Sequence, residues 1–146
     1  MDFELKTRLT IALDAMGGDN APQMVIDGVN LARLKFPNVH FLLFGDEDQI
    51  KPLLYKNEKL KNSVSIRHTN EFVSAEERPT VALRQGRKSS MQLAINAVRD
   101  GEAAGIVSAG NTGALMAMSK ICLKMLPGIN RPAIAAPCPT RVGESV

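Results

Sequence analysis

The chain has 146 residues, 45% of them hydrophobic and 23% charged, which is the composition of one ordinary globular domain. This composition excludes a disordered or collagen-like protein, and two cysteines cannot hold together a fold of this size by disulfides. Residues 1–73 contain nine Lys/Arg and ten Asp/Glu, whereas residues 74–146 contain nine Lys/Arg and only five Asp/Glu, so the second half is basic. Aromatic residues are scarce, which argues against nucleic acid as a partner.

Short apolar runs alternate with amphipathic ones in the first half of the chain. Strands are expected at residues 9–13, 39–44 and 64–68. Helices are expected from Pro22, a residue that a first helical turn tolerates, to about residue 36, and from residue 47 to residue 55. This alternation is typical of βα units.

The same alternation continues in the second half. We expect a long loop (69–80), a helix from Ser89 or Ser90 to Arg99, a strand (104–107), a helix ending near Met125, and a fifth strand (133–136). Apolar strands separated by helices predict an α/β fold with a mostly parallel sheet covered on both faces. Ligands of such sheets bind beyond the carboxyl ends of the strands.

The first strand-to-helix turn, DAMGGDNAP, carries a carboxylate and two adjacent glycines. Gly17 and Gly18 let the backbone turn sharply and approach a ligand closely. A tight turn followed by a helix capped by Asp19 or Asn20 explains the motif equally well. Asp14 is harder to explain in that way, because it ends a buried strand, where a carboxylate needs partners or a function.

The second turn, SAGNTG, leads into the long helix after the fourth strand. Amides at a helix start bind oxyanions, and Ser108, Asn111 and Thr112 can add side-chain hydrogen bonds. Gly110 and Gly113 leave room for a ligand, although a capped helix without a ligand would need similar residues. The turn matches neither a P-loop nor a dinucleotide fingerprint.

A basic segment precedes the helix that begins at residue 89 or 90. Arg84, Arg87 and Lys88 are interpreted either as a solvated charge cluster or, with Ser89 and Ser90, as groups that reach an acidic ligand. A solvated cluster is the commoner meaning of such a segment, and ligand binding is the alternative.

Ordinary nucleophiles and metal ligands are poorly represented. Cys122 lies at core spacing on the last helix and is expected to be a buried apolar residue. Cys138 lies between two prolines in an expected loop, without a nearby base. His40 and His68 lie on strands and are interpreted as structural. We therefore expect no metal, no cofactor and no covalent intermediate. The N-terminus lacks a signal-peptide core and no apolar run could span a membrane, so a cytoplasmic protein is expected.

Four motifs in order, DAMGGDNAP, RPTVALRQGRKSSM, DGEAAGIVSAGNTGALMA and INRPAIAAPCPT, resemble the phosphate acyltransferases of bacterial phospholipid synthesis, the PlsX family. The resemblance implies transfer of a long-chain acyl group from acyl carrier protein to inorganic phosphate, giving acyl phosphate. It also implies a three-layer α/β/α fold like that of isocitrate and isopropylmalate dehydrogenases. A homodimer, located in the cytoplasm and attached peripherally to the membrane, is implied as well.

The resemblance also indicates which residues form the site. The residues of the matching motifs are the candidates, and their individual roles are our own prediction. We predict catalytic roles for Asp14, Asp19, Lys88 and Asn111, and binding of phosphate or thioester by Gly17, Gly18, Ser89, Ser90, Ser108, Gly110, Thr112 and Gly113. Family members are more than twice as long, so residues 1–146 are expected to be the N-terminal part of a single domain whose C-terminal part is absent.

Two other functions stay open. The chain could belong to another enzyme of this fold, a phosphotransacetylase or a metal-dependent hydroxyacid dehydrogenase, although the latter needs a carboxylate cluster and a nucleotide site that the sequence does not show. It could also be a non-catalytic fragment that binds phosphate, or binds the acidic carrier protein through residues 84–88.

Overall fold

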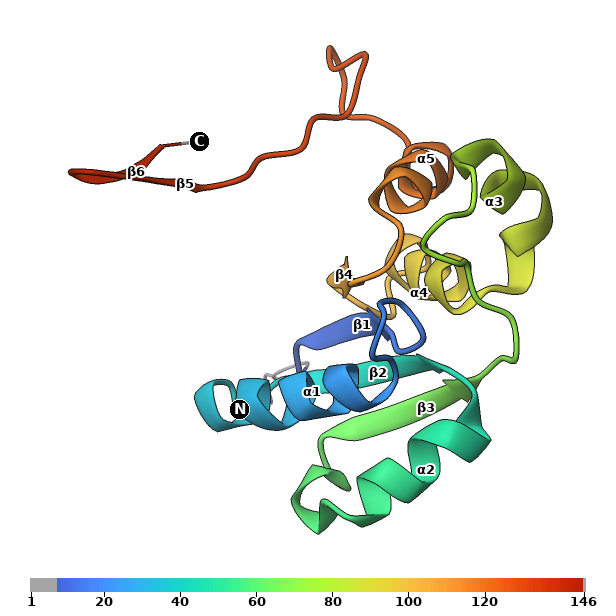
Figure 1. The fold of residues 1–146 in the computed structure, drawn as a ribbon, viewed down its shortest axis with the longest axis vertical. Coiled ribbons are helices and arrows are strands. Elements are labelled where there is room, and N and C mark those ends of the chain that lie inside the picture. Colours follow the sequence, from blue (N-terminus) through green and yellow to red (C-terminus); the bar gives the residue numbers. More distant parts are fainter. Residues whose placement is uncertain (1–7, 146) are drawn as a thin grey trace, which may run out of the picture.

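A computed structural model describes residues 8–145 of the chain, and four of its strands form one parallel sheet (Figure 1). The strands are β1 (Thr10–Asp14), β2 (His40–Gly45), β3 (Val64–His68) and β4 (Gly105–Val107), in the order β3-β2-β1-β4. The predicted α/β architecture with a parallel sheet is confirmed. The N-terminal stretch that lacks a signal-peptide core lies, as far as residue 7, outside the described residues.

Helices cover both faces of this sheet. They are α1 (Gln23–Lys35), α2 (Glu47–Tyr55), α3 (Pro79–Gln85), α4 (Ser90–Arg99) and α5 (Thr112–Leu123), with 3-10 turns η1 (Glu58–Leu60) and η2 (Gly86–Lys88). One core lies between the sheet and helices α1 and α2, and a second lies between the sheet and α4. A third core joins α3, α4 and α5 beyond the sheet (Figure 1).

The alternation of side chains along β1 decides which face each residue serves. Leu13 packs in the core under α1 and α2, whereas Ala12 packs in the core under α4. Because side chains alternate with a period of two, Asp14 lies on the same face as Ala12. The carboxylate therefore emerges on the α4 face, at the carboxyl end of the central strand.

Helix α3 was not predicted from the sequence. The expected loop ends at Arg78, and Pro79 occupies the first turn of a seven-residue helix. Seven residues are too few to display a 3.6-residue period, and such a short helix depends on tertiary packing. The proline was the one local signal for its start.

The predicted fifth strand is wrong. Residues 133–136 form no strand, and Ile134 is 64% exposed. Instead, β5 (Cys138–Thr140) and β6 (Gly143–Ser145) form a small antiparallel hairpin, so Cys138 lies on a strand and not in a loop. The hairpin projects away from the sheet (Figure 1). An apolar run becomes a strand only where a neighbour offers hydrogen bonds, and residues 133–136 find none among the described residues.

A histidine at the start of β2 gives a pH prediction. The pKa of His40 is lowered from its usual value because burial desolvates the imidazolium and Arg8 repels it. The folded protein then binds fewer protons than the unfolded chain, so the stability from this residue is complete above about pH 6.5 and is lost as the pH falls below it.

Unfolding by urea should therefore require less denaturant at pH 5.5 than at pH 7.5, and His40→Asn should reduce that difference. Carboxylates with lowered pKa values titrate below about pH 4 and do not interfere. A variant with the same pH dependence as the original chain would contradict this role of His40.

Candidate functional site

The carboxylate of Asp14 joins three segments that are far apart in the sequence. It is 3% exposed. Its Oδ1 accepts hydrogen bonds from the Ser90 hydroxyl at 2.6 Å and from the Met16 amide at 3.3 Å, and its Oδ2 accepts one from the Ser108 hydroxyl at 2.8 Å. The cluster lies where β1 and β4 end, the edge at which the parallel sheet predicts a site.

The two glycine-containing turns pack directly on each other. A Cβ added to Gly17 would lie 2.5 Å from Asp14 Oδ2 and 2.8 Å from Ser108 Oγ. One added to Gly110 would lie 3.1 Å from the Cα of Gly17. Gly18 has a φ of +108° and its Cβ would lie 3.3 Å from Ala109. The two turns can pack this closely because these residues lack a side chain, and the sequence did not reveal this packing role.

Asn111 uses its whole side chain within the protein. Its Oδ1 accepts from the Ala114 amide at 2.9 Å and caps α5. Its Nδ2 lies within hydrogen-bond distance of three carbonyl oxygens, those of Ser74 (3.3 Å), Ala75 (3.0 Å) and Glu77 (2.7 Å). Asn111 therefore holds the loop before α3 against the start of α5.

The first amides of α5 are the open donors of this site. The Leu115 amide bonds to the Asn111 carbonyl and the Ala114 amide to the Asn111 side chain. The amides of Thr112 and Gly113 have no acceptor among residues 8–145. Thr112 is exposed, while a Cβ on Gly113 would lie 2.9 Å from Pro79 Cγ. The start of α5 therefore offers two open amide donors, and anion binding by them stays a prediction.

The start of α4 is a capped turn. Ser89 is fully buried, donates to the Gly86 carbonyl at 2.6 Å and accepts from the Gln92 amide at 3.3 Å. Its hydroxyl is thereby committed to the N-cap of α4. Lys88, directly before it, is exposed. Of the predicted residues in this block, Ser90 joins Asp14, Ser89 caps the helix, and the Lys88 side chain stays accessible to a ligand.

The predicted capping of α1 by Asp19 or Asn20 is wrong. The N-cap residue is Pro22, and no side chain caps this helix. Asn20 contributes only its carbonyl, which accepts from the Met24 amide at 3.0 Å. Asp19 is exposed and makes no hydrogen bond with the Asp14 cluster in the described part of the chain.

Thr69 is a residue of this region that the sequence analysis missed. Its hydroxyl donates to the Lys88 carbonyl at 2.6 Å and accepts from the Glu71 amide at 3.2 Å. It directly follows β3, so a polar residue after a parallel strand was the available signal.

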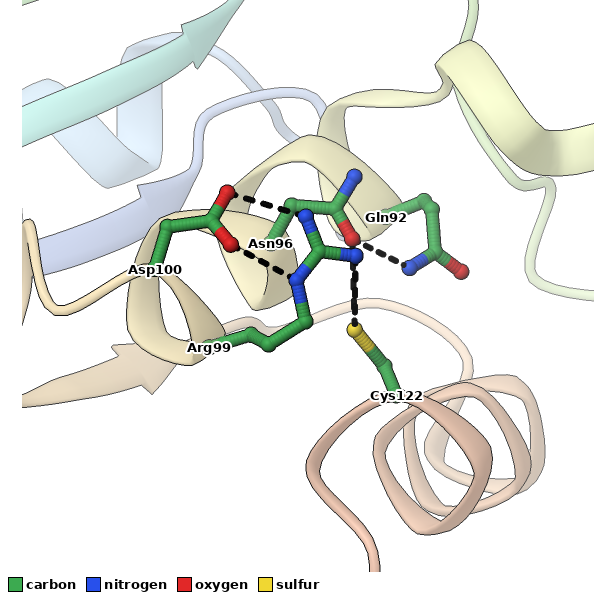
Figure 2. A network of polar contacts seen from close by, with 5 residues as sticks. All are labelled: Gln92, Asn96, Arg99, Asp100 and Cys122. Atoms are coloured by element: carbon green, nitrogen blue, oxygen red, sulfur yellow. Dashed lines mark hydrogen bonds and ion pairs between the residues drawn. The ribbon is translucent and has the colours of Figure 1, made fainter.

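Cys122 is half-buried: it packs at the edge of the core that joins α3, α4 and α5, as its spacing predicted, and it also belongs to a polar contact between α4 and α5. Figure 2 shows its thiol beside Asn96, whose Oδ1 accepts from Cys122 at 3.2 Å and from Gln92 at 3.0 Å. Arg99 donates to the sulfur at 3.8 Å and pairs with Asp100. The thiol is half-buried because its helix face meets polar residues of α4.

This thiol lies ten residues beyond Thr112 on α5, or about 15 Å along the helix. It is therefore remote from the Asp14 cluster. Both histidines, which we predicted to be structural, have hydrogen-bond partners within the protein: His40 Nε2 pairs with the Ser65 hydroxyl at 2.9 Å, and His68 Nδ1 accepts from the Glu47 amide at 3.2 Å.

An apolar groove of about 330 Å³ lies between α1 and the sheet, and it reaches the Asp14 cluster. Ile11, Met24 and Val107 are among its apolar lining residues, and Asp14, Ser108 and Ala109 also line it.

Within residues 8–145, no group of three or more His, Cys, Asp or Glu side chains is arranged to hold a metal ion. None of the helices described has the length and hydropathy needed to cross a bilayer.

Comparison with known proteins agrees with these motifs. The sequence profile of the family described as "Fatty acid synthesis protein" matches residues 9–146. The chain is 58% identical over 142 residues to a phosphate acyltransferase of Rhodospirillum rubrum, covering 97% of this chain and 41% of the relative. It is 56% identical to one of Paramagnetospirillum magneticum (97% and 40% covered) and 50% identical to one of Shewanella amazonensis (96% and 41%). The chain thus spans about 40% of the length of these curated relatives.

Proposed function

Because the chain belongs to the fatty acid synthesis protein family, we propose that it takes part in moving a long-chain acyl group from acyl carrier protein to inorganic phosphate. The start of α5 is the observation that carries this proposal. Its open amides at Thr112 and Gly113 are suited to a small oxyanion, because they point outward at the positive end of the helix dipole.

The proposed reaction needs no protein nucleophile. A phosphate oxygen attacks the thioester carbonyl carbon, and a tetrahedral oxyanion forms. As the C–S bond breaks, the carrier thiolate leaves and acyl phosphate remains. The protein must hold phosphate beside the thioester and stabilise the developing charge. The leaving thiol has an ordinary pKa near 8.5, so it requires little help from an acid.

Several parts of the chain fit these tasks. Lys88 is accessible as a countercharge for phosphate, and the amides and hydroxyl at Thr112 supply hydrogen bonds. The apolar groove that ends at Asp14 and Ser108 suits a hydrocarbon chain. Arg84, Arg87 and Lys88 are exposed and would attract an acidic carrier protein. In the longer protein we propose a cytoplasmic homodimer that attaches peripherally to the membrane.

The proposal is tested by incubating the purified chain with palmitoyl-acyl carrier protein and measuring free thiol. Release that requires inorganic phosphate supports acyl transfer. If no thiol is released although the carrier binds in a salt-sensitive manner, the second candidate, a non-catalytic piece that retains carrier binding, is favoured. The uneven basic charge of the second half favours this second candidate over other binding functions.

Thr112→Ala should lower phosphate-dependent thiol release at least tenfold, since it removes a hydroxyl donor from the proposed anion site. Ser119→Ala, on the same helix but two turns away, is the matched control and should keep activity within twofold. Equal activity of the Thr112 variant and the original chain would remove this hydroxyl from the mechanism.

A further inference from the structure

We propose that Ser108 and Asp14 are positioning residues: they fix the turn that leads into α5, and the Ser108 hydroxyl is not itself a ligand of phosphate. This inference rests on the proposed phosphate site at the start of α5. It changes the role that the motifs implied for both residues, from contact with substrate to support of the groups that make contact.

The direction of its hydrogen bonds decides what the Ser108 hydroxyl can do. An ionised carboxylate only accepts, so the Ser108 hydroxyl must donate its single hydrogen to Asp14, 2.8 Å away. The same oxygen then has lone pairs free, and it accepts from the Gly110 amide at 3.1 Å. The Ser108 hydrogen is therefore unavailable to an anion, and its oxygen orients the backbone of the turn.

Asp14 is itself held in place by the sheet and by α4. It ends a central strand of the sheet, and its Oδ1 is occupied by Ser90 and by the Met16 amide. Ser90 is fully buried at the start of α4. Through Asp14, the turn at Ser108 is therefore held in a fixed position relative to the sheet and α4, although Ser108 lies 94 residues further along the chain.

The turn at Ser108 orients the donors at the start of α5. Gly110 is followed by the N-cap residue Asn111 and by the open amides of Thr112 and Gly113. Donors that stabilise a developing charge are effective when they are already fixed before the ligand arrives. A displacement of about 1 Å can cost as much as a hundredfold in rate. Without the Ser108 oxygen the Gly110 amide loses its acceptor, so the backbone that leads into α5 is no longer fixed.

The experiment is a titration of the ¹⁵N-labelled chain with inorganic phosphate, following the amide signals of Thr112 and Gly113. We expect Ser108→Ala to raise the Kd for phosphate at least tenfold and to speed hydrogen exchange at the Gly110 amide. Ser108→Thr keeps the hydroxyl and should restore most of the affinity. Asp14→Asn should raise the Kd similarly, and the double variant should be no worse than either single one.

The matched control is Asn96→Ala. The Asn96 side chain also joins distant segments, because its Oδ1 accepts from Gln92 on α4 and from Cys122 on α5, but this contact is remote from the Asp14 cluster. This variant should lose stability to a similar degree in urea unfolding and keep the Kd within twofold. If both variants weaken binding equally, the effect is a general loss of stability and the positioning role is refuted.

The outcomes separate the two proposals. If the original chain shows no phosphate-dependent shift at Thr112 and Gly113, the proposed function fails and this inference falls with it. If the original chain binds and Ser108→Ala binds as tightly, the phosphate site stands and the positioning role is overturned.

Discussion

Replacing Gly17 with alanine is expected to lower the free energy of unfolding by about 1–3 kcal/mol, the range for an overpacked interior. The new methyl group would lie 2.5 Å from Asp14 Oδ2 and 2.8 Å from Ser108 Oγ, so one of these side chains must move. Moving either one breaks the hydrogen bond between them. Phosphate binding should therefore weaken together with stability, as measured by urea unfolding and by phosphate titration.

Gly28→Ala is the matched control for this variant. Gly28 lies in the exposed part of α1, and a Cβ there meets no atom within 4 Å. Alanine is the better helix former, so this substitution should raise the free energy of unfolding by about 0.5–1 kcal/mol. The same chemical change thus has opposite signs at two positions. A Gly17 variant as stable as the original chain would show that the two turns are not packed as described.

Replacing Asn111 with alanine is expected to cost about 2 kcal/mol, because it removes the cap of α5 and the donors to the preceding loop. Asn111→Asp separates these two roles. The aspartate keeps a capping oxygen for the Ala114 amide, but it cannot donate to the carbonyls of Ser74, Ala75 and Glu77. Its negative charge would instead face those oxygens.

Hydrogen exchange distinguishes the two variants. The Glu77 amide, which bonds to the Ser74 carbonyl, should exchange faster in both variants because the loop is released in both. The Ala114 amide should exchange faster only in Asn111→Ala. Protection of Glu77 that survives in Asn111→Asp would mean that the loop is held by other contacts.

The sequence alone determined the order of the four parallel strands along the chain, most of the helices, and the sheet edge at which polar turns meet. These features follow from local periodicity and from proline and glycine positions, which each segment carries within itself. The motifs of the two turns also led to the family, and the profile match over residues 9–146 agrees with it. Local patterns were insufficient for α3 and misleading for residues 133–136, where packing partners decide.

Only the tertiary structure decided what each site residue does. Asp14 meets Ser90 and Ser108 across 76 and 94 residues of chain, and no local pattern encodes such partners. The capping and loop-holding role of Asn111 likewise depends on carbonyls more than 30 residues away. Hydrogen bonds need atoms about 3 Å apart, and for distant segments that proximity arises only when the sheet and its helices have assembled.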